Sequence, residues 1–128
     1  MRRPKPSADA EERYATDVAL AARRAELLGT ASEAESRFRQ AQDRRAPDAE
    51  IRPLAENLDT ALTAAMRAAY AAMRAEIGPR GYDDRIFRRK AMAKPRVHAL
   101  TAEAEHLLTL RETHRLNGIP AVQYQPAP

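Results

Sequence analysis

Alanine, rather than bulky apolar residues, supplies most of the material from which this chain can build a core. The 128 residues include 28 alanines, but leucine, isoleucine, valine and phenylalanine together number only 20. Alanine has the highest helix propensity of all residues and loses no side-chain entropy on burial. Glycine and β-branched residues are scarce and tryptophan is absent, so a β-rich fold is excluded. The composition predicts an all-α protein, and the length is that of one domain.

The first predicted helix spans residues 8 to about 45. Gly29 lies inside it, and Thr30 and Ser32, just beyond, each fit the start of a second helix. Because the apolar spacing continues in step through Gly29, we expect one continuous helix rather than two helices that meet there. The apolar positions follow two overlapping seams: Tyr14, Val18, Ala21, Ala25 and Leu28, then Leu27, Ala31, Ala34, Phe38 and Ala41.

The second predicted helix begins between residues 48 and 52, with Asp48 as its cap, and ends at Ile77 before a Gly-Pro stop signal. Its length, roughly 40 Å, exceeds the roughly 36 Å diameter of a compact globule of this size, which predicts a rod or a protein completed by a partner. A stripe of small side chains lets a neighbouring helix approach closely. This helix-packing seam consists of Ala61, Ala65, Ala68, Ala72 and Ala75. It either docks on the first helix in an antiparallel hairpin, the default for a short connection, or serves self-association.

Two further helices are predicted after this hairpin. A short third helix starts at a cap on Asp83 or Asp84 and ends at about Lys94, before Pro95. A fourth helix spans about residues 96 to 117 and packs on the hairpin to complete an elongated helical bundle. Its inner positions are Val97, Leu100, Ala104, Leu107, Arg111 and His114. The chain then divides into a basic arm (1–7), a helical bundle domain (8–117) and an extended Pro/Gln tail (118–128).

Positive charge is concentrated in two short stretches, although the chain as a whole carries a net charge of only +4. Residues 79–96 contain seven basic and two acidic residues, whereas the segments 8–46, 47–78 and 97–128 are slightly acidic. The candidate binding residues are Arg80, Arg85, Arg88, Arg89, Lys90, Lys94 and Arg96, together with Arg2, Arg3 and Lys5 in the arm.

On the third helix, Arg85, Arg88, Arg89 and Met92 form one stripe, while Ile86 and Phe87 are expected to anchor the helix to the bundle. Guanidinium groups bind phosphates and carboxylates bidentately. The stretch therefore fits nucleic acid, an acidic protein partner, or a face that is solvated or paired with the chain's own acids. Abundant alanine and arginine are typical of GC-rich coding, which favours a bacterial or phage source and raises arginine without selection for phosphate.

Residue patterns that carry catalysis or bind cofactors are missing from the sequence. There is no cysteine, no glycine-rich phosphate loop and no nucleophile elbow. His98, His106 and His114 are spaced eight apart on one predicted helix, too far to share a metal, and the Glu-x-x-His pair at Glu103 has no second copy. We expect no enzymatic activity, no metal, no cofactor and no small-molecule substrate.

We predict a non-enzymatic helical protein-interaction module, an adaptor or assembly component that acts through its helix-packing faces. The modest supply of bulky side chains favours additional burial against a protein partner or a second copy. The alternative is a small nucleic-acid-binding protein that uses residues 80–96 and the arm. No apolar run is long enough to span a membrane and no signal peptide is visible, so we expect a cytoplasmic protein, or a virion-associated one if phage-encoded.

Overall fold

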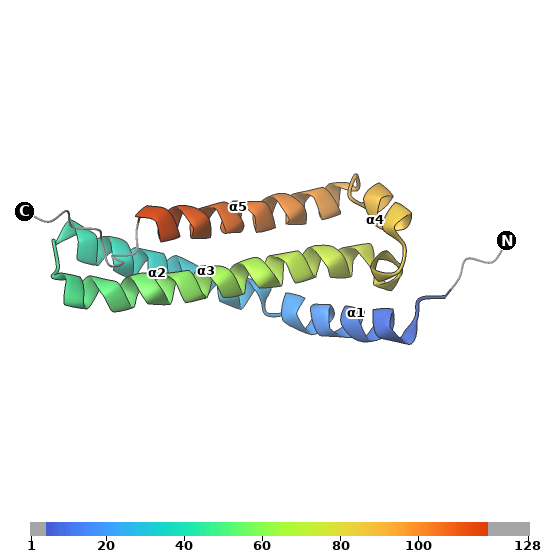
Figure 1. Ribbon diagram of the computed structural model, residues 1–128, viewed down its shortest axis with the longest axis horizontal. Coiled ribbons are helices and arrows are strands. Elements are labelled where there is room, and N and C mark those ends of the chain that lie inside the picture. The colour runs from blue at the N-terminus through green and yellow to red at the C-terminus, as the bar shows by residue number, and fades with distance from the viewer. Residues whose placement is uncertain (1–4, 118–128) are drawn as a thin grey trace, which may run out of the picture.

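The computed structural model describes residues 5–117, and within them it is an all-α, elongated helical bundle (Figure 1). Arg2 and Arg3 of the predicted arm and the predicted tail 118–128 lie outside the described residues. The helices are α1 (Ala8–Ala21), α2 (Arg24–Asp43), α3 (Asp48–Ile77), α4 (Arg85–Ala91) and α5 (Pro95–Asn117), with a 3₁₀ turn, η1 (Pro79–Tyr82), between α3 and α4.

Helix α3 is the centre of the bundle and, at 30 residues, is about 45 Å long. Helices α1 and α2 both run antiparallel to α3. Helix α2 packs along the first half of α3, and α1 packs along its second half and against η1. Helix α5 returns antiparallel along α3, and at the α4 end it lies on the opposite side of α3 from α1 (Figure 1). The antiparallel hairpin and the packing of the last helix are therefore as predicted, and the molecule is a rod.

The prediction of one continuous helix over residues 8–45 is wrong, because the helix breaks at Ala22 and Arg23 and not at Gly29. The Arg23 backbone N–H donates to the Leu20 carbonyl oxygen at 3.0 Å. This is a 3₁₀-type hydrogen bond to the third residue back, where an α-helix would use the fourth. Gly29 lies inside α2 with open space where a Cβ would stand, so the helix tolerates it. The break redirects the chain so that α1 follows the second half of α3 and reaches η1.

The two predicted seams of the first segment differ in outcome on either side of this break. In α2, Leu27, Ala31, Phe38 and Ala41 are buried and the second seam is confirmed. The first seam is wrong at Val18 in α1, which is 43% exposed, and at Ala25 in α2, which is also exposed. The residues that α1 buries are Ala10 and Asp17.

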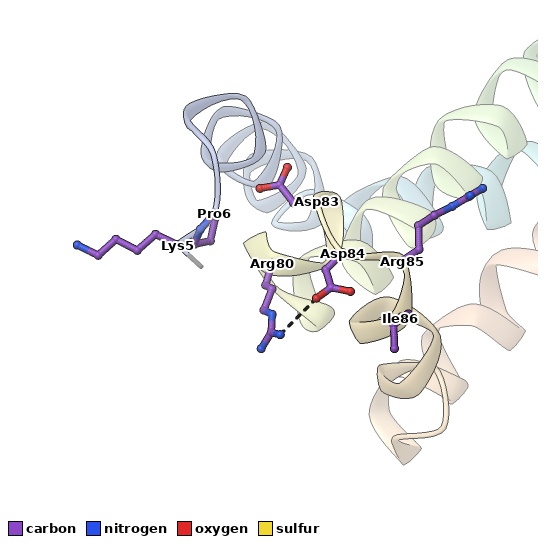
Figure 2. A pocket seen from close by; sticks show the side chains of 7 residues that line it. All are labelled: Lys5, Pro6, Arg80, Asp83, Asp84, Arg85 and Ile86. Atoms are coloured by element: carbon purple, nitrogen blue, oxygen red, sulfur yellow. Dashed lines mark hydrogen bonds and ion pairs between the residues drawn. The ribbon is translucent and has the colours of Figure 1, made fainter. Parts of the chain in front are cut away.

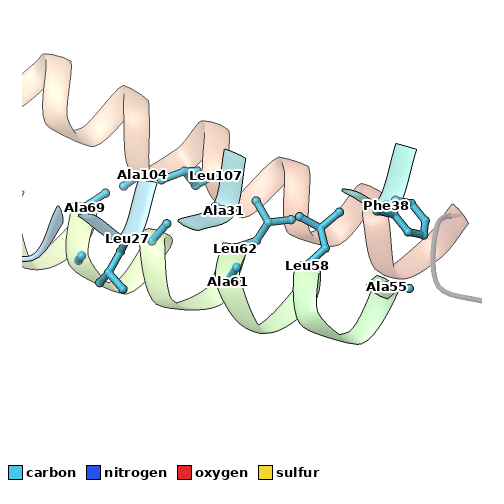
Figure 3. Close-up of a cluster of buried hydrophobic side chains, with 12 residues drawn as sticks. Leu27, Ala31, Phe38, Ala55, Leu58, Ala61, Leu62, Ala69, Ala104 and Leu107 are labelled. Carbon is cyan, nitrogen blue, oxygen red and sulfur yellow. The ribbon is translucent and has the colours of Figure 1, made fainter. Parts of the chain in front are cut away.

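The core is built mainly from alanine, as Figure 3 shows along α3. Within the predicted packing seam, Ala65 and Ala68 have no exposed surface and Ala61 is buried, whereas Ala72 and Ala75 are half-buried. The main cluster comprises Leu27, Ala31, Phe38, Ala55, Leu58, Ala61, Leu62, Ala65, Ala68, Ala69, Ala104 and Leu107. Small side chains from α3 meet larger ones from α2 and α5 in this cluster, an arrangement that lets helices pack closely.

A smaller cluster closes the α4 end of the bundle. Ile77, Ala91 and Val97 are buried there, and Met73, Phe87 and Met92 pack against them. Gly78 ends α3 with a φ of 97°, a backbone conformation that glycine adopts without strain. This cluster joins the end of α3 to α4 and to the first turn of α5.

Two predicted helix boundaries need correction. Asp48 does not cap α3: Pro47 is the N-cap residue and Asp48 lies in the first turn, where its charge favours the helix dipole. The third predicted helix ends at Ala91 rather than Lys94, and Pro95 begins α5 instead of only ending the helix before it. Proline suits the first helical position because the N–H that it lacks has no intrahelical partner there.

The inner face of α5 is the predicted one. Val97, Leu100, Ala104 and Leu107 are buried, and so is His114 at the far end of the bundle. The His114 ring packs edge-on against Phe38, with the centroids 5.1 Å apart, and its Nε2 lies 2.8 Å from the Ala55 carbonyl oxygen. This histidine is a packing residue that ties α5 to α2 and α3.

Candidate functional site

Helix α4 is held to the bundle by its cap and by one aromatic side chain. The Asp84 carboxylate accepts a hydrogen bond from the Phe87 backbone N–H at 2.9 Å and pairs with the Arg80 guanidinium at 3.3 Å. The hydrogen bond from the Phe87 N–H, together with the Arg80 guanidinium, lowers the pKa of Asp84 and outweighs desolvation, which raises it. Phe87 points into the smaller cluster, and the Arg80 guanidinium covers its ring at 4.6 Å.

The prediction that Ile86 also anchors α4 is wrong, because its side chain is 69% exposed. Residues 86 and 87 are adjacent on a helix and point about 100° apart, so when Phe87 faces the bundle Ile86 is turned outward. Met92, expected on the arginine stripe, is half-buried against the smaller cluster. Helix α4 therefore presents an apolar side chain to solvent among its basic ones.

The basic side chains of residues 79–96 gather at one end of the rod. Arg80 is engaged by Asp84 and Phe87, as described above. The other six are exposed, and no carboxylate of the described chain lies within 4.0 Å of them: Arg85, Arg88, Arg89, Lys90, Lys94 and Arg96. These six residues and Ile86 are referred to below as the α4 surface. Pairing with the chain's own acids, one of the readings left open by the sequence, does not occur for these six side chains.

Unpaired basic side chains are concentrated at the α4 end. Elsewhere in residues 5–117 most arginines pair with acids, as Arg24 does with Glu103 and Arg115 with Asp59, whereas Arg37, Arg52 and Arg67 have no carboxylate within 4.0 Å. The positive charge that the sequence concentrates in residues 79–96 thus remains available to a partner.

The N-terminal segment is anchored beside the α4 surface by a contact that the sequence did not predict. The Ser7 backbone N–H donates to Asp83 Oδ2 at 2.7 Å, and the Ser7 hydroxyl donates to Asp83 Oδ1 at 3.0 Å. The same hydroxyl oxygen accepts from the Ala10 N–H at 3.0 Å and so caps α1. Lys5, the basic arm residue that the structure describes, consequently lies at the α4 end of the molecule.

Two shallow hollows meet on this end of the bundle. Figure 2 shows the first, which lies between the N-terminal segment and α4 and is lined by Lys5, Pro6, Arg80, Asp83, Asp84, Arg85 and Ile86. The second follows α4 and is lined by Arg85, Ile86, Arg88, Arg89 and Met92. Because Arg85 and Ile86 line both, they form the ridge between the hollows.

A partly buried polar network, centred on Asp17, supports the base of this site and was missed by sequence reasoning. Arg74 of α3 donates from Nε to Asp17 Oδ2 at 2.8 Å and from Nη2 to Oδ1 at 3.1 Å. The Tyr82 hydroxyl of η1 donates to Asp17 Oδ2, and the Arg13 guanidinium lies over the Tyr82 ring at 5.4 Å. The network joins α1, α3 and η1, from which α4 extends.

The charges in this network shift the pKa values of its members in opposite directions. Burial by itself raises the pKa of Asp17, but hydrogen bonds from Arg74 and Tyr82 together outweigh it and the pKa lies below its ordinary value. The pKa of Tyr82 is raised, first by burial and then by the Asp17 carboxylate that its hydroxyl bonds. Asp17 is therefore an anion at neutral pH and Tyr82 a neutral hydrogen-bond donor.

No group of three histidine, aspartate or glutamate side chains in residues 5–117 is placed to hold a metal ion. None of the helices in that range is long and apolar enough to cross a membrane.

No protein-family model, curated protein or solved structure matches the chain significantly. Function must therefore be argued from the site itself.

Proposed function

We propose that the protein is a non-enzymatic interaction module that binds an acidic segment of a partner protein through the α4 surface. The observation that carries this proposal is the gathering of six unpaired, exposed basic side chains at one end of the rod, where Arg85, Arg88 and Arg89 line a hollow together with the exposed Ile86. Arginine pairs bidentately with carboxylates, and unpaired cations at one end of a rod attract an anionic partner from a distance. The protein then acts as an adaptor or assembly component.

The predicted packing seam is a weaker candidate for the interaction than the α4 surface. Ala65 and Ala68 are enclosed by the chain's own helices and offer no area to a second copy. The α4 surface, in contrast, is exposed in the single chain.

Binding of nucleic acid is the second candidate, favoured by the unpaired arginines and by the anchoring of the N-terminal segment at the same end. The aromatic side chains near the surface are already covered by the chain's own arginines, because Arg80 lies over the Phe87 ring and Arg13 over the Tyr82 ring. The α4 surface also contains no asparagine or glutamine to read base edges. A phosphate backbone offers no apolar group that could pack on the exposed Ile86. Together, these three features favour a protein partner over nucleic acid.

A titration at two salt concentrations tests this choice. Fluorescently labelled probes are a glutamate-rich peptide, a mixed-sequence DNA duplex and single strands of DNA and RNA. We expect the peptide to bind more tightly than any nucleic acid at physiological salt, with affinity that falls as salt rises, because exposed charges are screened over about 8 Å. The variant R85A/R88A/R89A should lose peptide binding by about tenfold or more while keeping its helical circular dichroism. Tighter binding of duplex or single strand, lost in this variant, would replace the proposal with the second candidate.

A further inference from the structure

We propose that the partner segment carries an apolar side chain with acidic residues on both sides, and that this apolar side chain seats on Ile86. This inference rests on the proposed function and specifies the partner's chemistry. It assigns separate tasks to two parts of the α4 surface: the arginines and lysines attract the segment, and Ile86 fixes its register.

The surroundings of Ile86 distinguish it from the other exposed apolar side chains of the described chain. Val18, Ile86 and Leu116 are 43%, 69% and 82% exposed. Val18 lies on α1 and Leu116 in the last turn of α5, at the opposite end of the bundle. Ile86 alone among them stands within the unpaired basic cluster, so an apolar contact there is combined with charge complementarity.

The outward orientation of Ile86 is imposed by the fold. The Asp84 cap fixes the first turn of α4, and the packing of the half-buried Phe87 against the smaller cluster fixes the rotation of the helix. A helix held at both points keeps Ile86 outward without a partner, so no side chain of the bundle needs to rearrange on binding. A preformed contact of this kind reduces the entropy cost of association.

The two hollows on either side of Ile86 accommodate the flanking acids. On the α4 side, Arg88 and Arg89 line the hollow, and no acidic residue does. On the other side, Lys5 and Arg80 line the hollow together with two aspartates. The Asp83 carboxylate is already bonded by Ser7, and the Asp84 carboxylate by the N-terminus of α4 and by Arg80. Arg85 stands between the hollows. We therefore expect the stronger charge contribution from acids that lie over Arg88 and Arg89.

An apolar contact at the ridge also strengthens the ion pairs beside it. When Ile86 is covered, water is excluded from the neighbouring arginines, and a carboxylate paired with them then interacts in a lower dielectric. A membrane surface would need a broad apolar face, but the remaining apolar residues of α4, Phe87 and Ala91, face the bundle. A protein segment with one apolar residue matches this surface better.

Two peptides that differ at one position test the inference on the full-length protein. Both have the same glutamate-rich flanks, and the central residue is leucine in one and serine in the other. The wild type should bind the leucine peptide about tenfold more tightly, because a partly buried aliphatic contact forms only with that peptide. The variant Ile86→Ser should bind both peptides equally, at the level of the serine peptide. Leu116→Ser, which removes a comparably exposed apolar side chain at the other end, should behave as the wild type.

The outcomes separate this inference from the proposed function. If the wild type binds both peptides equally, or if Ile86→Ser retains the preference for leucine, the apolar anchor is disproved while acidic-segment binding stands. If the wild type binds neither peptide, the proposed function fails and the inference with it. Tighter binding to anionic phospholipid vesicles than to the leucine peptide, abolished in Ile86→Ser, would assign the surface to membranes and overturn both.

Discussion

Replacing Ala65 with glutamate is expected to unfold the protein. Ala65 has no exposed surface and belongs to the main core cluster at the middle of α3. A glutamate there must overpack a site sized for a methyl group and bury an unpaired carboxylate, and together these effects cost about 4 kcal/mol or more. Single domains of this size are stable by about 5–15 kcal/mol, so a loss of this size removes a large part of the folding free energy and unfolds a domain near the lower end of that range.

Thermal unfolding followed by circular dichroism measures this effect. The matched control is Ala102→Glu on α5, where the alanine is exposed and the same substitution should change the free energy of unfolding by less than about 0.5 kcal/mol. A folded Ala65→Glu variant with wild-type stability would contradict the packing of α3 as the centre of the bundle. Conversion of a stable wild-type oligomer into folded monomers by Ala65→Glu would show that the seam serves self-association instead.

Removing the Asp17 carboxylate should produce the second-largest loss of stability, about 2–3 kcal/mol for Asp17→Ala. The substitution leaves the Arg74 guanidinium without its bidentate partner and the half-buried Tyr82 hydroxyl without an acceptor. The figure is below that for a fully buried ion pair because the Arg74 side chain is 38% exposed. Chemical denaturation measures it, with Glu35→Ala as the control. Glu35 pairs with Arg39 on the surface of α2, and its loss should cost less than about 0.5 kcal/mol.

The pH dependence of stability provides an independent readout of the same network. Since the pKa of Asp17 is lowered in the folded protein, the stability from its ionised form is fully present above the unfolded pKa of about 3.9. It is lost as the pH falls below that value and through the folded pKa. The loss of stability with acid should therefore be smaller in Asp17→Ala than in the wild type. Equal acid sensitivity of the two proteins would mean that Asp17 is not held as an anion by Arg74 and Tyr82.

The fold class and the helix hairpin were predictable because they depend on local signals. Alanine content, the 3.6-residue period and the Gly78-Pro79 stop act within a few residues of one another. The break at Ala22 and Arg23 carries no glycine or proline, and it serves contacts of α1 with α3 and η1 that lie far away in the sequence. The one indication of this break in the sequence was that the apolar positions change from the first seam to the second near residue 25.

The candidate site was predictable in its composition but not in its geometry. The basic residues of 79–96 could be counted in the sequence, but whether each pairs with an acid depends on tertiary neighbours. The Asp17 network illustrates the difficulty, because its partners Arg74 and Tyr82 are 57 and 65 residues away along the chain. The exposure of Ile86 required knowledge of which side of a two-turn helix Phe87 occupies.

The central claim is that the α4 surface, and not net charge in general, binds the partner segment. A pair of charge-matched variants tests it. R85E/R88E/R89E reverses three arginines of the α4 surface, and R37E/R52E/R67E reverses three that are exposed elsewhere and have no carboxylate within 4.0 Å among residues 5–117.

The most direct measurement is the affinity of both variants for the glutamate-rich leucine peptide at physiological salt. Both variants change the net charge by the same amount, so a difference in affinity between them reports the position of the reversed charges and not their number. We predict that the α4 variant loses binding by about tenfold or more relative to the control variant, with both proteins still helical. Equal loss of affinity in the two variants, or binding unchanged in the α4 variant, would contradict the account.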